Sequence, residues 1–239
     1  MDSVAVPSAS EVIARLRALG DPANVAGMAR FGISSEGTLG VPVPAIRAIA
    51  KELKPARRND PEAAHRLALE LWRSGVHEAL MLAAFIDVPA LVTREQAEEW
   101  AADLDSWDTC DQLCGNLLDK TPFAWELVDE WASRPEPFVK RAAFALMTQL
   151  AVHDKKAPDE PFLHLLTLVE READDDRPYV RKAVNWALRQ IGKRDAALWS
   201  AAVDAARRLR ERESRAARWV ASDALRELQS AAVRSRLGL

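Results

Sequence analysis

The sequence predicts an all-α protein, built as a solenoid of stacked helix pairs with a concave face along one side. Three observations predict this fold class: apolar residues recur three and four positions apart, strand patterns are nearly absent, and one helix-sized segment is repeated. Glycines are few, 9 of 239 residues, whereas Pro and Asp stand at the breaks between periodic segments. Because Pro and Asp favour turns and helix starts, these breaks indicate helices joined by short connections.

The helical periodicity runs through segments that span the chain. Each segment places its apolar residues on one stripe, as expected of a helix that buries one face. A further helix is expected near the start, where Ser8 and Glu11 have the spacing of a capping box. The periodic segments are 45–53, 79–86, 111–120, 141–150, 162–170 and 221–228, and the breaks fall at 20–24, 58–64, 87–90, 120–123, 134–138, 157–162 and 175–179.

An internal repeat indicates how these helices stack. The segment "PFVKRAAFALMTQL" begins at Pro137, and "PYVRKAVNWALRQI" begins at Pro178, 41 residues further on. The two share Pro, an aromatic residue, Val, two basic residues and Ala. A period of roughly 40 residues made of helix pairs is typical of HEAT repeats. A helical pattern from Trp219 lies about one period beyond, and no linker interrupts the array. Residues 1–239 are therefore predicted to form a single HEAT-like repeat domain.

Composition and charge exclude several classes of protein. With 49% hydrophobic and 29% charged residues, the chain has the composition of a soluble globular protein. Its two cysteines exclude a disulfide framework and fit a reducing, cytoplasmic location. Neither a signal peptide nor a membrane-spanning run is expected. The net charge is −3, so any excess of basic charge is local. One such excess is the group of six arginines in 207–218. Judged by charge alone, that segment is predicted to be a solvated helix face on which basic and acidic side chains form ion pairs.

The repeated helix at 178–191 carries a tryptophan away from its apolar stripe. At 100° per residue, Trp186 falls about 130° from the centre of the stripe. Its neighbours on that face are Lys182, Arg189 and Lys193. Two explanations stay open: the indole is buried under a neighbouring helix, or it is a stacking platform beside phosphate-binding charges. The stripe itself consists of Val180, Ala183, Val184, Ala187, Leu188 and Ile191.

Two other segments carry candidate functional residues. In "DSWDTCDQLCGNLL", Trp107 and Asp111 are four positions apart, so the pattern places an indole beside a carboxylate at the edge of the apolar stripe. Asp108 could instead serve the helix N-terminus. In the helix from Pro137, the pattern points Arg141 away from the core among small residues, with room to reach a ligand. Taken alone, Arg141 would read as an ordinary surface arginine.

No metal or cofactor site is predicted. Cys110 and Cys114 are also four positions apart, but no His or Cys partners accompany them, so they read as buried thiols. The four histidines have no catalytic or metal-binding spacing. Phosphate-binding loops, dinucleotide-binding glycine motifs and kinase motifs do not occur.

Four motifs in order, "GVPVPAIRAIAKEL", "WDTCD", "KRAAFALM" and "YVRKAVNWALR", resemble the AlkD-like family of DNA alkylation repair proteins. These are HEAT-repeat DNA glycosylases, and the likeness covers nearly the whole chain. It implies excision of positively charged N3- or N7-alkylated purines from double-stranded DNA, without base flipping and without a cofactor, metal or membrane; we expect a monomer. By motif, it implies catalytic roles for Asp111, Trp107 and Trp186 and a nearby arginine, Arg141. We expect Lys182, Arg189 and Lys193 to contact the DNA backbone, with 207–218 as weaker candidates.

Two further hypotheses remain. The acidic net charge and scattered basic faces also suit a non-catalytic HEAT module that binds damaged or branched DNA. A third possibility is a solenoid that binds another protein. Only the first hypothesis requires that Trp107, Asp111 and Trp186, which are far apart in sequence, meet on one surface.

Overall fold

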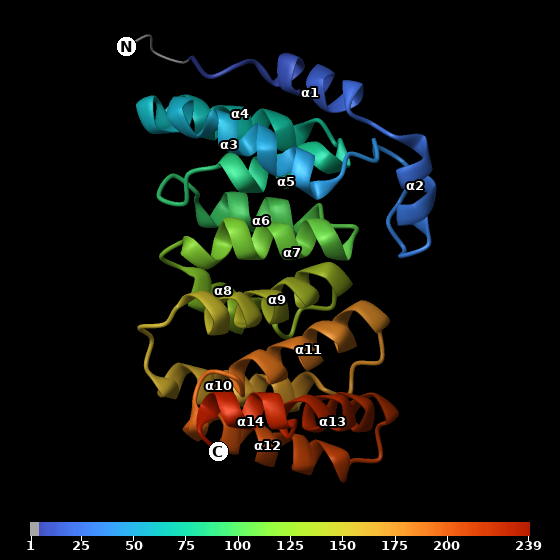
Figure 1. Cartoon of the computed structure of the whole chain (residues 1–239), viewed down its shortest axis with the longest axis vertical. Coiled ribbons are helices and arrows are strands. Elements are labelled where there is room, and N and C mark those ends of the chain that lie inside the picture. The colour runs from blue at the N-terminus through green and yellow to red at the C-terminus, as the bar shows by residue number, and fades with distance from the viewer. Residues whose placement is uncertain (1–4) are drawn as a thin grey trace. The chain divides into compact units, whose positions relative to one another are not determined.

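The computed structural model describes residues 5–239, and every regular element in that range is a helix (Figure 1). The chain divides into two compact units, Met1–Pro122 and Phe123–Leu239, and each is described by itself below. The all-α prediction is confirmed. The predicted concave face and the single domain over 1–239 involve both units and stay predictions.

The first unit is organised around the short helix α5, which packs against α3, α4 and α7. Its helix starts follow from capping residues. Ser8 and Glu11 form the predicted capping box of α1, and Asp21 and Asp60 cap helices that begin with proline. The elements are α1 (Ala9–Ala18), α2 (Pro22–Ala29), α3 (Val43–Asn59), α4 (Pro61–Arg73), α5 (His77–Ile86), α6 (Arg94–Ala102), α7 (Trp107–Asn116) and the 3-10 helix η1 (Leu118–Lys120).

The second unit contains the repeated segments. Both start as helices at the repeated prolines, and the two helices, α9 and α11, pack against each other. Next to α11 lies α13, whereas α10 packs against α12, so alternate helices form two layers (Figure 1). The elements are α8 (Ala124–Trp131), α9 (Pro137–His153), α10 (Asp159–Glu172), α11 (Pro178–Ile191), α12 (Ala196–Arg210), α13 (Arg215–Leu228) and α14 (Ala231–Leu237).

The predicted apolar stripes are the buried cores of these helices. All six residues of the α11 stripe are fully buried, and so are the inward positions of α7, Cys110, Leu113, Cys114 and Leu117. Both cysteines are buried thiols that form no disulfide, as the sequence predicts. Within residues 5–239, no helix combines the length and apolar character needed to cross a membrane.

Candidate functional site

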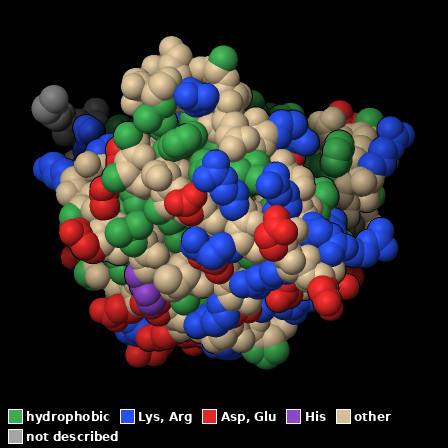
Figure 2. All heavy atoms as spheres, turned by 90° about the horizontal axis from the view of Figure 1, so that it is seen from below, with side chains coloured by type: hydrophobic (Ala, Val, Ile, Leu, Met, Phe, Trp, Pro, Cys, Tyr) green, Lys and Arg blue, Asp and Glu red, His purple; other side chains and the backbone are tan. Residues whose placement is uncertain are grey.

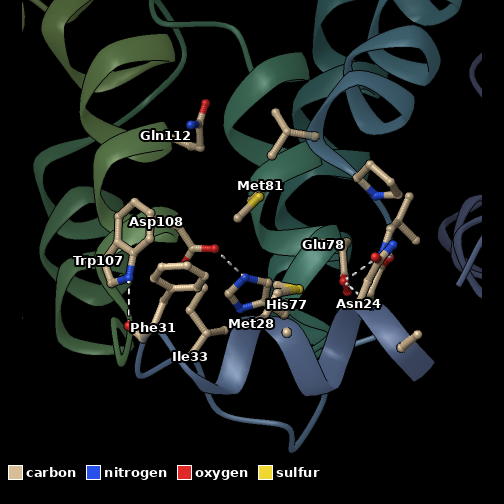
Figure 3. Close-up of a pocket in the computed structure, with 16 residues that line it drawn as sticks. Asn24, Met28, Phe31, Ile33, His77, Glu78, Met81, Trp107, Asp108 and Gln112 are labelled. Carbon is tan, nitrogen blue, oxygen red and sulfur yellow. Dashed lines mark hydrogen bonds and ion pairs between the residues drawn. The ribbon is translucent and has the colours of Figure 1, made fainter. Parts of the chain in front are cut away.

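The first half of the candidate site lies at the start of α7. Trp107 is the first residue of this helix, and its indole Nε1 donates a hydrogen bond of 3.1 Å to the carbonyl of Phe31, just after α2 (Figure 3). Asp111 follows one helical turn later, so both side chains lie on one face of α7. Both are partly exposed. The indole is therefore held by a second segment of the chain, one helical turn from Asp111.

A pocket of about 500 Å³ opens beside Trp107, between α2, α5 and α7. Its walls are mainly apolar and include Met28, Phe31, Met81 and Trp107 (Figure 3). Polar side chains enter its lining from three segments: Asn24, His77, Glu78, Asp108 and Gln112. The pocket thus shares Trp107 with the predicted catalytic pair.

Glu78 fixes the loop that closes one side of this pocket. Its buried carboxylate accepts hydrogen bonds from the backbone N–H groups of Leu39, Gly40 and Val41, at 2.9, 2.6 and 3.1 Å. Gly40 has a φ of +80°, and a Cβ there would lie 2.2 Å from the Asp21 carbonyl oxygen. Only glycine fits this turn without displacing the backbone. The start of α5 thereby holds the loop that joins α2 to α3.

His77 and Asp108 form a second buried link, between the starts of α5 and α7. The imidazole Nε2 lies 2.9 Å from the Asp108 carboxylate, whose other oxygen accepts hydrogen bonds from the Ser106 hydroxyl and the Thr109 N–H (Figure 3). Burial alone would lower the pKa of His77, but the hydrogen bond and charge of Asp108 raise it above its ordinary value. Burial would raise the pKa of Asp108, but the bond and charge of His77 lower it. The residue next to Trp107 is thus anchored by an ion pair.

This ion pair predicts a pH dependence of the free energy of unfolding. Because the folded-state pKa of His77 is raised, its stabilisation is complete below about pH 6.5 and is lost as the pH rises through the folded-state pKa. The lowered pKa of Asp108 adds stabilisation that is complete above about pH 4 and is lost on acidification. In the wild type, the free energy of unfolding should fall between mildly acidic and alkaline pH. We expect denaturant titrations to show a smaller fall in His77→Gln. The exposed His153→Gln is the control; an unchanged pH profile for His77→Gln would contradict the assignment.

The second half of the candidate site lies on α11, in the second unit. Trp186 lies off the buried stripe, as predicted, and is half-buried, while Lys182 is exposed. Arg189 and Lys193 both form ion pairs with Glu227 of α13. Lys182 has no carboxylate partner within residues 5–239, whereas the charges of Arg189 and Lys193 are partly compensated by Glu227.

Arg141 differs from its prediction. It is only 5% exposed, and its guanidinium donates a hydrogen bond of 2.8 Å to the Tyr179 carbonyl at the start of α11. The outward orientation expected from the helix pattern is wrong because α11 packs along α9 and covers that side. The adjacent Lys140 is also buried and pairs with Glu172 and Asp175. Arg141 thus joins α9 to the start of the helix that carries Lys182 and Trp186.

Several arginines of the segment 207–218 form ion pairs with acidic residues outside the segment. Arg207 pairs with Asp204, Arg208 with Glu170, and Arg212 with Asp174. Figure 2 likewise shows basic side chains interleaved with acidic ones over the face it presents. These pairs support the interpretation of a solvated face with mixed charges.

In the first unit Trp107 and Asp111 lie one turn apart on α7, and in the second unit Arg141 is hydrogen-bonded to the start of α11. The meeting of α7 with Trp186 spans the two units and stays a prediction. His77, Glu78 and Phe31 were not predicted from the sequence. His77 and Asp108 are 31 positions apart, and no spacing rule connects them.

Comparison with known proteins agrees with the fold. A family model described as "DNA alkylation repair enzyme" matches residues 12–228. One solved structure comes from work on "a new family of proteins related to the HEAT-like repeat DNA glycosylases with affinity for branched DNA structures". It matches with a TM-score of 0.77 and 19% identity, covering 98% of this chain and 97% of that chain. No curated protein matches. At 19% identity the structural likeness establishes the HEAT-like fold alone.

The family model covers nearly all of the two units, including α7, α9 and α11 with every predicted site residue. The chain therefore belongs to the DNA alkylation repair enzyme family.

Proposed function

We propose that the protein is a DNA glycosylase that releases N3- or N7-alkylated purines from double-stranded DNA. The observation that carries this proposal is the pair on α7. Trp107 and Asp111 lie one turn apart, both partly exposed, and the indole is fixed by the Phe31 carbonyl. A carboxylate near an aromatic side chain that is fixed in position can stabilise a sugar that becomes positively charged during the reaction. Membership of the DNA alkylation repair family supports the same assignment.

The chemistry follows from the charge of the lesion. A purine alkylated at N3 or N7 is cationic, so its glycosidic bond breaks with departure of a neutral base, and no strong general acid or cofactor is needed. The positive charge passes to the deoxyribose as an oxocarbenium ion. Asp111 stabilises that cation and orients the attacking water, as carboxylates do in glycoside hydrolysis. The indoles of Trp107 and Trp186 add cation–π attraction of about 1–2 kcal/mol each when desolvated.

The remaining residues of the site bind the DNA backbone in this proposal. Lys182 is exposed, and Arg189 and Lys193 exchange their contact with Glu227 for DNA phosphates. Arg141 contributes positive potential and holds the start of α11 in position. The base departs without first being extruded from the duplex, and water attacks C1′ of the sugar, so access to the sugar edge is enough.

A second candidate function is a non-catalytic module that binds branched or damaged DNA. The ion pairs of Arg189 and Lys193 with Glu227 favour this second function. Cations whose charge is partly neutralised bind the phosphates of regular duplex DNA weakly. The related solved protein belongs to a family with affinity for branched DNA structures.

One assay separates the two functions. The full chain is incubated with methylated duplex DNA, and free 7-methylguanine and 3-methyladenine are measured against DNA alone. Base release above the spontaneous rate is expected for the glycosylase. Retention of branched DNA in gel-shift titrations, with no base release over long incubation, would support the second function and overturn the first. Absence of DNA binding even at low salt would point to a protein-binding role.

A further inference from the structure

The starts of α11 and α13 lie side by side and present an indole with a cation stacked on it. A ladder of contacts aligns the two helices: the Asn185 side-chain amide donates to the Val220 carbonyl at 3.0 Å, and Arg189 reaches Glu227 further along. At the first turns of the same pair, the guanidinium carbon of Arg181 lies 4.7 Å from the centre of the Trp219 ring. Trp219 therefore lies beside the helix that carries Lys182 and Trp186.

Trp219 is 38% exposed, which is unusual for the largest apolar side chain. The Arg181 guanidinium lies over the ring, and more than a third of the side chain is still exposed to solvent. An exposed aromatic side chain beside a cation is an arrangement with which proteins stack unpaired nucleobases. A buried structural tryptophan would have no such surface.

The cations around Trp219 differ from other basic residues of the unit. Arg181, Lys182 and Arg215 have no carboxylate partner within residues 5–239, and the Arg181 Nε is buried without a hydrogen-bond partner. Arg215 lies one turn before Trp219 on α13, and Lys182 follows Arg181 on α11. The acid one turn after Trp219, Asp223, is already paired with Arg226. The exposed indole thus lies beside Arg181, and two further basic residues without carboxylate partners occupy neighbouring positions on the same two helices.

We propose that Trp219, Arg181, Lys182 and Arg215 bind an unpaired nucleotide of DNA. The base stacks on the exposed indole, and its phosphate lies among the three cations. Bases within a duplex are already stacked on both faces, so this site selects single-stranded segments such as flaps, gaps or branch points. The proposal rests on the DNA binding of the proposed function, but it places recognition of DNA structure at residues outside the predicted catalytic set.

Fluorescence anisotropy with two labelled DNAs tests the proposal in the full-length protein. One DNA is a plain duplex and the other is the same duplex with a short single-stranded flap. Trp219→Ala is expected to reduce the preference for flap over duplex by about tenfold, and Trp219→Phe to retain part of it, because stacking needs an aromatic face. Leu163→Ala removes an apolar side chain of similar exposure from α10 and should leave the preference unchanged. Flap DNA should also quench tryptophan emission more in the wild type than in Trp219→Phe.

Either of two results overturns the proposal: a wild type without flap preference, or a Trp219→Ala variant that keeps it. The second result would leave the exposed indole as a contact for another protein. Base release by the wild type, measured in parallel on methylated duplex, tests the proposed function separately. Release without any Trp219-dependent flap preference would refute only the nucleotide site, whereas no binding of either DNA would refute both.

Discussion

Replacement of Asp111 by Asn is expected to slow release of 7-methylguanine from methylated duplex DNA by about 10²–10³-fold, the usual loss when one preorganised electrostatic group is removed from a reacting centre. The amide has nearly the same shape as the carboxylate but no negative charge. It therefore cannot stabilise the oxocarbenium ion that forms as the neutral base departs. Asp111 is partly exposed at the surface of α7, so the variant should fold normally.

The matched control is Glu99→Gln, which removes a carboxylate charge from an exposed position on α6 of the same unit. Single-turnover rates for wild type and both variants should be measured together with the affinity for unmodified duplex. We expect Asp111→Asn to bind duplex DNA at least as well as the wild type, because a negative charge near phosphates is lost. Equal rates of base release in Asp111→Asn and wild type would contradict the role of Asp111.

Replacement of Glu78 by Gln is expected to lower the free energy of unfolding by about 2–4 kcal/mol, since each buried hydrogen-bonding group left without a partner costs about 1–3 kcal/mol. Glu78 is 1% exposed, and its carboxylate accepts hydrogen bonds from three backbone N–H groups. A glutamine side chain offers one carbonyl oxygen and turns an NH₂ group toward the other donors. The loss would loosen the 39–41 loop and, through α2, the carbonyl of Phe31 that holds Trp107.

Urea or guanidinium titration of the full chain measures this change. Glu52→Gln is a suitable control because Glu52 is an exposed acid that pairs with Arg15 on the surface of the same unit, where ion pairs contribute little. A Glu78→Gln variant as stable as the Glu52→Gln variant would show that the loop does not depend on the carboxylate.

The elements that the sequence predicts well are those specified by local pattern. The periodic apolar stripe of 178–191 is the buried face of α11, and the prolines at 137 and 178 are first residues of matching helices. Trp186 is off the stripe because its angular position follows from helix geometry alone. The same geometry places Trp107 and Asp111 on one face of α7, and no tertiary information is needed for either result.

Features that depend on packing could not be predicted in the same way. A single-helix projection places Arg141 opposite the apolar stripe, but it contains no neighbouring helix, and in the fold the side chain is buried and bonded to the start of α11. Arg189 and Lys193 meet Glu227 only because α11 and α13 align in the fold. The links made by His77 and Glu78 join segments more than 30 positions apart, which no local pattern connects.

A double-mutant cycle tests most directly whether the residues of α7 and α11 act on one nucleotide. Single-turnover rates of 7-methylguanine release are measured for wild type, Trp107→Ala, Trp186→Ala and the double variant. If both indoles stabilise the same cationic sugar, the two losses are non-additive, with an interaction energy of about 1 kcal/mol or more. Losses that add within about 0.5 kcal/mol would mean that the two tryptophans act at separate places, and the shared catalytic site would be refuted.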